Sequence, residues 1–286
     1  MKSALTAIAC VVALPTATAR AQSYPMKPVR MIAASSPGSA VDIVARIVAQ
    51  KLGENLGQQV VIDNRAGAGG IVGMQIATAA PPDGYTFMLT STAYGYLIDK
   101  QEVPVDLVKS FAPVALIGLG EAALAVHPAL PVKSVKELIA LAKARPGELN
   151  YASSGIGGFP HMNTELLKFK AGINVVHVPF KGGGPAIADV VAGQTQIYFG
   201  ALVTVMPFIQ SGRLKLIAVG GSKRNPNLPN VPLISETVPG YESYIWWGIF
   251  APPATPAALI SRVHSEVLNV LDPPDRKSTR LNSSHT

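Results

Sequence analysis

The sequence predicts two α/β domains, and three observations support this fold class. The chain has 286 residues, of which 48% are hydrophobic and 14% charged, so it is too long and too apolar for one small domain. From residue 29 onward, short β-branched runs alternate with amphipathic stretches, a pattern typical of parallel sheets covered by helices. A strand, two serines, a glycine turn and a helix occur in that order twice, at VRMIAASSPGSAVDIVARIVAQ (29–50) and LNYASSGIGGFPHMNTELLKF (149–169).

Ten apolar, β-branched runs predict the strands of these domains. They are residues 29–34, 60–63, 86–90, 112–119, 122–126, 149–152, 175–178, 197–200, 215–219 and 246–250.

The helices between the strands are predicted from capping residues and prolines. Ser134 and Glu137 have the spacing of a capping box, and the following apolar residues share one helical face. Pro160, Pro185 and Pro256 each stand where the first residue of a helix is expected, the last behind Thr255 as N-cap.

The two ends of the chain are predicted to lie outside the domains. Residues 1–21 have the basic start, apolar stretch and small-x-small site of a secretory signal peptide, although lipid attachment at Cys10 is an open alternative. Cys10 is the only cysteine, so the exported chain would contain no disulfide. The segment DRKSTRLNSSH (275–285) ends the helical pattern of 259–271, so residues 275–286 are predicted to be a non-native tail, with a polar native tail as the alternative.

Charge and motifs argue against several classes of function. The formal net charge of +7 owes much to the termini, and no basic stripe with interleaved aromatic residues suggests nucleic acid. NRAGAGGIVG (64–73) does not fit the dinucleotide pattern, because Val72 stands where glycine is required. The sequence contains no nucleophile elbow and no His-Glu-x-x-His zinc motif, so we expect no enzyme, no cofactor and no metal.

The repeated serine-glycine loops are the best candidates for a binding site. We call residues 35–42 loop 1 and residues 153–161 loop 2. Loops at the carboxyl ends of parallel strands meet ligands, and each of these loops offers hydroxyls and the unpaired N–H groups of a helix start. Either loop alone would be explained by capping and turning, but two matching loops favour a carboxylate or phosphate ligand.

Some residues near these loops have ordinary explanations as well. Asp42 is expected to cap the helix and brace loop 1 more than to touch a ligand. His161 either contacts the ligand or is a satisfied histidine at a helix start. Lys181, in the glycine-rich stretch PFKGGGP (179–185), either meets the anion or is solvated.

Several segments together resemble one family, the substrate-binding receptors of tripartite tricarboxylate transporters, or Bug receptors. They include YPMKPVRMIAASSPGSAVDIVARIVAQ (24–50), PPDGYTFML (81–89), HVPFKGGGPAIADVVAGQTQIYF (177–199) and WWGIFAPPATP (246–256), and the similarity spans residues 22–274.

This resemblance implies a periplasmic-binding-protein (Venus flytrap) fold, with two α/β domains and a ligand cleft between them. The implied domains are residues 22–123 with 223–274, and residues 124–222. The implied protein is a periplasmic monomer that binds a small carboxylate, largely through backbone N–H groups, and delivers it to a membrane permease. The implied ligand-binding residues are Ser35, Ser36, Gly38, Ser39, Ala40, Asp42, Ser91, Thr92, Ser153, Ser154, Gly155, Gly157, Gly158, His161, Lys181 and Gly182.

Two departures from the family pattern bear on the ligand. Ser35 and Ser39 replace an aromatic residue and a glycine that are frequent in the family, which would suit a larger or more polar ligand. Gly200 stands where the family commonly has an acidic residue, which weakens the case for an amino acid. An enzyme on the same scaffold acting on a carboxylate or phosphate, and a sensor without a permease, are the alternatives.

Overall fold

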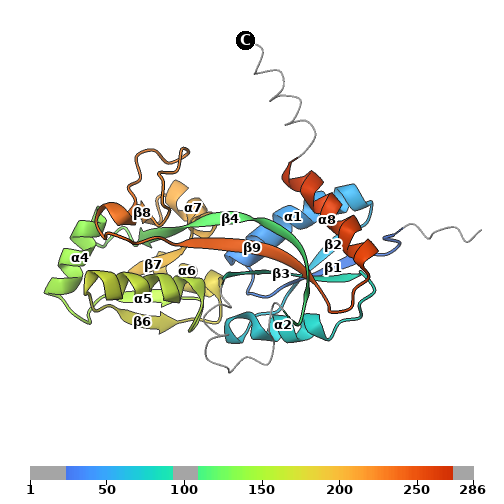
Figure 1. Ribbon diagram of the computed structural model, residues 1–286. Coiled ribbons are helices and arrows are strands. Elements are labelled where there is room, and N and C mark those ends of the chain that lie inside the picture. The colour runs from blue at the N-terminus through green and yellow to red at the C-terminus, as the bar shows by residue number, and fades with distance from the viewer. Residues whose placement is uncertain (1–23, 93–108, 273–286) are drawn as a thin grey trace, which may run out of the picture.

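The computed structural model describes residues 24–92 and 109–272 (Figure 1). The predicted signal peptide with Cys10 and the predicted non-native tail therefore lie outside the described residues. Within the described ranges, the structure contains no helix of the length and apolar character that crossing a membrane requires.

The described chain forms one continuous nine-stranded sheet, which is divided between two lobes (Figure 1). The first lobe contains β1 (Val29–Ala33), α1 (Ala40–Leu56), β2 (Val60–Asn64), a 3-10 turn (Ala68–Gly70), α2 (Ile71–Thr78), β3 (Thr86–Ser91) and α8 (Ala257–Leu271). The second lobe contains α4 (Val135–Ala144), β5 (Asn150–Ser153), α5 (Phe159–Ala171), β6 (Val176–Pro179), α6 (Gly183–Val191), β7 (Ile197–Ala201), α7 (Leu202–Gln210) and β8 (Lys215–Val219).

Two long antiparallel strands, β4 (Ala112–Val126) and β9 (Tyr244–Ala251), join the lobes. The strand order is β2-β1-β3-β9-β4-β7-β5-β6, with β8 paired to β4. β1 pairs in parallel with β2 and β3, and β5 pairs in parallel with β6 and β7, so each lobe has the parallel sheet that the sequence predicts. The carboxyl ends of both parallel sets face the space between the lobes, which places loops 1 and 2 there.

β4 corrects one sequence prediction, because it is a single strand where residues 112–119 and 122–126 were expected to form two. Gly120 lies within the strand and leaves room for the indole of Trp247 on the partner strand β9. Any Cβ at position 120 would lie inside the 3.0 Å that real Cβ atoms essentially never reach. The strand absorbs its irregular stretch through register shifts against β9 between Pro113 and Gly118.

The helix starts match the predictions only in part. Ser134 caps α4 as expected, but the Glu137 carboxylate accepts from Lys133 N–H and not from Ser134 N–H. Pro160 is the second residue of α5 and Pro185 the third of α6, each behind a glycine N-cap. Pro256 precedes α8 as its N-cap, and Thr255 instead donates its hydroxyl to the carbonyl of Pro252.

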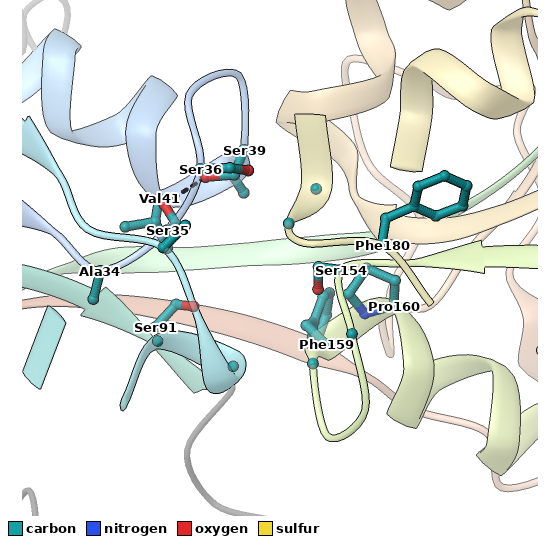
Figure 2. A pocket seen from close by; sticks show the side chains of 18 of the residues that line it. Ala34, Ser35, Ser36, Ser39, Val41, Ser91, Ser154, Phe159, Pro160 and Phe180 are labelled. Carbon is teal, nitrogen blue, oxygen red and sulfur yellow. Dashed lines mark hydrogen bonds between the residues drawn. The ribbon is translucent and has the colours of Figure 1, made fainter. Parts of the chain in front are cut away.

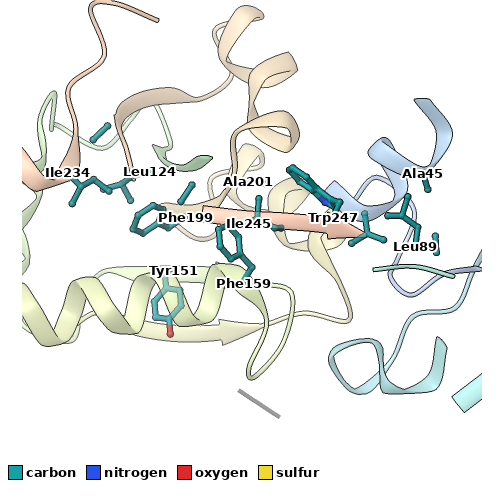
Figure 3. Close-up of a cluster of buried hydrophobic side chains, with 14 of the residues drawn as sticks. Ala45, Leu89, Leu124, Tyr151, Phe159, Phe199, Ala201, Ile234, Ile245 and Trp247 are labelled. Carbon is teal, nitrogen blue, oxygen red and sulfur yellow. The ribbon is translucent and has the colours of Figure 1, made fainter. Parts of the chain in front are cut away.

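One apolar cluster runs through both lobes along the sheet (Figure 3). Leu89 belongs to its first-lobe end, Ile245 and Trp247 on β9 to its middle, and Phe199 and Tyr151 to its second-lobe end. The return segment before β9, which includes a 3-10 turn (Ile234–Glu236), packs on the second lobe, where the Tyr241 hydroxyl donates to the carbonyl of Asn163 (3.0 Å). The exact domain boundaries at 123/124 and 222/223 stay a prediction.

Candidate functional site

A cavity of about 800 Å³ lies between the two lobes. In Figure 2, Ser35, Ser36 and Ser39 of loop 1 stand on one side, and Ser154, Phe159 and Pro160 of loop 2 stand on the other. Ten of the sixteen predicted site residues line it: Ser35, Ser36, Ser39, Ala40, Ser91, Ser154, Gly155, Gly158, Lys181 and Gly182. The other six are not part of its lining: Gly38, Asp42, Thr92, Ser153, Gly157 and His161.

Five helices begin at this cavity, since the first residues of α1, α2, α5 and α6 line it, as does Ala201, the N-cap of α7. Ser39 caps α1 by accepting from the N–H of Asp42 (3.3 Å), whereas no side chain caps the other four. Each helix start carries unpaired N–H groups and the positive end of the helix dipole. Lys181 is the one charged residue among the described residues that line the cavity, so the site is built for a negative ligand.

Loop 1 is held from behind by Asp42, which is 4% exposed. Its carboxylate accepts from Gly38 N–H (2.9 Å), Arg46 Nε (3.0 Å) and Asn64 Nδ2 (2.9 Å). Burial alone would raise the pKa of Asp42, but the hydrogen bonds from Arg46, Gly38 and Asn64 keep that pKa below its ordinary value. The carboxylate is thus ionised and braces the loop, as the sequence predicts.

The stretch 64–73 forms a third wall of the cavity, which the sequence analysis did not assign. Ala66, Gly67, Gly70 and Ile71 line the cavity, and Asn64 ties this stretch to loop 1 by donating to the carbonyl of Ser35 (3.3 Å). The position of this stretch in the sequence could have revealed its place in the site. This stretch follows β2, the parallel neighbour of β1, so its loop opens at the same edge of the sheet.

Loop 2 is held in shape by two glycines and by the side chains of Ser153 and His161. Gly155 and Gly157 have φ of 114° and 76°, a region that favours glycine. The buried hydroxyl of Ser153 bonds the N–H of Gly155 (3.1 Å), and Nδ1 of His161 accepts from the N–H of Gly157 (3.3 Å). Of the two explanations for His161, the structure favours the satisfied helix-start histidine.

The two lobes touch at loop 1 and the glycine-rich start of α6. A Cβ on Gly182 would overlap the side chain of Ser36, and a Cβ on Gly184 would overlap the carbonyl oxygen of Pro37. The run of glycines therefore lets the second lobe approach loop 1 backbone to backbone.

Apolar side chains complete the cavity and were also missed. They are Val41, Ile71, Ile156, Phe159, Phe180 and Ile245. Tyr198 lies buried at the cavity wall, and burial raises the pKa of its hydroxyl, which stays neutral. A Cβ at Gly200 would overlap the ring of Tyr198, so a larger residue at position 200 would displace that ring.

Thr92 has a structural contact instead of a place in the cavity. Its hydroxyl accepts from the backbone N–H of Trp246 on β9 (2.9 Å), so it ties the end of β3 to the strand that joins the lobes. Ser91, one residue earlier, does line the cavity.

Comparisons with known proteins agree on one family. Residues 44–282 match the model described as "Tripartite tricarboxylate transporter family receptor". The chain is 33% identical to Protein BugT of Bordetella pertussis, over 88% of this chain and 78% of that protein. The matched range includes part of the segment predicted to be non-native, so that prediction stays untested.

Two solved structures from Rhodopseudomonas palustris share the fold. One was solved with adipate and has 32% identity and a TM-score of 0.83, over 90% of this chain and 87% of that chain. The other, MatC with bound malate, has 28% identity and a TM-score of 0.82, over 89% of this chain and 88% of that chain. The predicted two-domain periplasmic-binding-protein fold is therefore confirmed.

Proposed function

Because the chain belongs to the receptor family of tripartite tricarboxylate transporters, we propose that it captures a small carboxylate between its lobes and delivers it to a membrane permease. The observation that carries the proposal is the convergence of five helix starts on a cavity in which, among the described residues, a lysine is the one charged lining residue. A carboxylate in this cavity meets unpaired N–H donors from both lobes.

The strength of such binding follows from the number of donors. Hydrogen bonds to a charged group contribute about 1.5 to 3 kcal/mol each, and micromolar affinity corresponds to about 8 kcal/mol. Two or three N–H groups thus supply much of the binding free energy without any arginine. Structural relatives solved with adipate and malate support a carboxylate as the ligand class.

We propose further that the protein works in the periplasm, as a monomer, after removal of residues 1–21, and that it releases its ligand chemically unchanged. The predicted signal peptide supports the location. The description of the family as a receptor supports binding without catalysis.

Calorimetry with a charged ligand and its neutral isostere tests the binding proposal. Adipate is expected to bind, whereas adipamide, which has the same length and no charge, is expected not to bind. Equal affinity for adipamide would contradict the role of negative charge. If adipate does not bind, benzoate and malate with their amides, and mass spectrometry of any co-purified ligand, extend the test to other carboxylates.

Delivery and chemical inertness need separate measurements. Uptake of the bound carboxylate by cells that express the permease should require this protein, and its absence should abolish uptake. The ligand's NMR spectrum should be unchanged after prolonged incubation, and a new product would indicate an enzyme.

A further inference from the structure

His161 lies directly behind the backbone of loop 2, although it does not line the cavity. It is the third residue of α5, and its Nδ1 accepts a hydrogen bond from the N–H of Gly157 (3.3 Å). The neighbouring Gly155 and Gly158 do line the cavity. Because Nδ1 accepts this bond, the observed loop requires an imidazole that carries no proton on Nδ1.

A second imidazole supports the other end of the same turn. The ring of His177 on β6 lies 4.4 Å from that of His161, centroid to centroid, and its Nε2 is hydrogen-bonded to the hydroxyl of Ser153. That hydroxyl also contacts both the N–H and the carbonyl of Gly155 (3.1 and 3.2 Å). The two histidines thus hold the turn at residues 155–158 through Gly157 and Gly155.

Two charged residues of α5, Glu165 and Lys168, act on this pair. Glu165 accepts from Lys168 (2.7 Å) and from the hydroxyl of Tyr151 on β5 (2.6 Å), whose ring stacks on His177 at 4.8 Å. Burial lowers the pKa of His161, with Glu165 opposing and Lys168 adding to the effect. Burial and then the neighbouring His161 lower the pKa of His177, so both rings are neutral at neutral pH.

We propose that protonation of His161 loosens loop 2 and makes the receptor release its carboxylate in acid. An imidazolium presents Nδ1–H to Gly157 N–H, so two donors face each other and the bond is lost. A charge on His161 also repels any charge on His177 across their ring contact. This inference rests on the proposed function, because it concerns the same binding loop.

The direction follows from proton linkage. Ligand binding to the ordered turn favours neutral His161, so ligand and proton compete. The dissociation constant then rises as the pH falls below the histidine pKa, by at most about tenfold per pH unit for one proton. Above the ordinary histidine value of about 6.5, affinity is independent of this group.

The test compares adipate affinity of the full chain with that of His161→Asn, at about pH 7.5 and about pH 5.5. The Asn side-chain oxygen keeps an acceptor for Gly157 N–H but does not titrate. The protonation of adipate itself is the same in both experiments and cancels in the ratio. The wild-type dissociation constant is expected to rise more than that of the variant, by at most about tenfold, because only the last of the two pH units lies below about 6.5.

A second variant, His177→Gln, keeps a hydrogen-bonding group near Ser153 and removes the neighbouring charge. The acid weakening should persist in this variant, because His161 still supplies the titrating acceptor for the N–H of Gly157. Circular dichroism and thermal unfolding at both pH values check that each variant is folded.

The outcomes separate this inference from the proposed function. Equal pH ratios for wild type and His161→Asn would overturn the role of His161 and leave carboxylate binding intact. If adipate binds at neither pH, the amide signal of Gly157 in the unliganded protein decides by NMR. That signal should shift as the His161 ring titrates, and a signal that does not respond would overturn the inference.

Discussion

The contact between the lobes makes Gly184→Ala the most informative substitution. Gly184 lies in the first turn of α6 and has an ordinary backbone conformation, so alanine fits the helix itself. Its Cβ, however, would overlap the Pro37 carbonyl oxygen of loop 1. The lobes would have to separate by roughly 1 Å to restore ordinary van der Waals contact at this point.

The expected effect is opposite for binding and for stability. Overpacking costs about 1 to 3 kcal/mol, and this penalty falls on the closed, liganded state. Affinity for adipate should therefore drop by about 5- to 150-fold, since about 1.4 kcal/mol corresponds to tenfold. In an open, unliganded protein the methyl group meets no carbonyl, and replacing a helical glycine adds up to about 1 kcal/mol to the unfolding free energy.

Calorimetry with adipate and urea unfolding of the unliganded protein measure both quantities. Gly118→Ala is the matched control, because a Cβ there has no heavy atom within 4 Å and no positive φ to strain. Gly182 is unsuitable, since its φ of 133° would strain any other residue. Unchanged affinity in Gly184→Ala would refute closure through this contact, and a loss of unliganded stability would indicate that the lobes are already closed without ligand.

Three further predictions concern the backbone site and its hinge. Lys181→Met should weaken adipate binding modestly. Gly38→Val or Gly157→Val should abolish it, because both glycines have φ near +75°, which valine does not adopt. If calorimetry shows that Lys181→Met abolishes binding while the glycine variants retain it, side-chain charge holds the ligand. Asn64→Ala removes the amide that donates to the Ser35 carbonyl, so it should lower the unfolding free energy measured in urea by about 1 to 2 kcal/mol. A change below about 0.5 kcal/mol would show that Asn64 does not brace loop 1. Small-angle scattering should give a smaller radius of gyration with saturating adipate than without, and an unchanged radius would argue for a site within one lobe.

Most of the fold was predictable, because each lobe is built from local patterns. The strand at 29–33 and the helix after it are readable from β-branched residues, a serine cap and apolar spacing within one short segment. The recurrence of Ser-Ser before a glycine turn then pointed to two loops, and both line the same cavity. Local signals suffice where neighbours in the sequence are also neighbours in space.

The features that were missed depend on distant partners. β4 is one strand only because β9, more than a hundred residues later, supplies the ladder and the indole that fills the space beside Gly120. The wall at residues 66–71 belongs to the site because β2 lies beside β1. His161 faces the back of loop 2, where its ring contacts His177 on β6, a contact that the residues around position 161 do not reveal.

The two binding loops are braced by groups that respond differently to acid. The lowered pKa of Asp42 keeps loop 1 braced above the ordinary aspartate value of about 3.9, and this contribution is lost only as the pH falls through that lowered pKa. His161 responds at a higher pH than Asp42 does. Its hydrogen bond to loop 2 contributes fully above about pH 6.5, and this contribution is lost as the pH falls from there toward the lowered pKa of His161. At a pH below the pKa of His161 and above the pKa of Asp42, acid therefore loosens loop 2 while loop 1 stays ordered. The Gly38 amide, bonded to Asp42, should keep its NMR position under conditions in which the Gly157 amide moves.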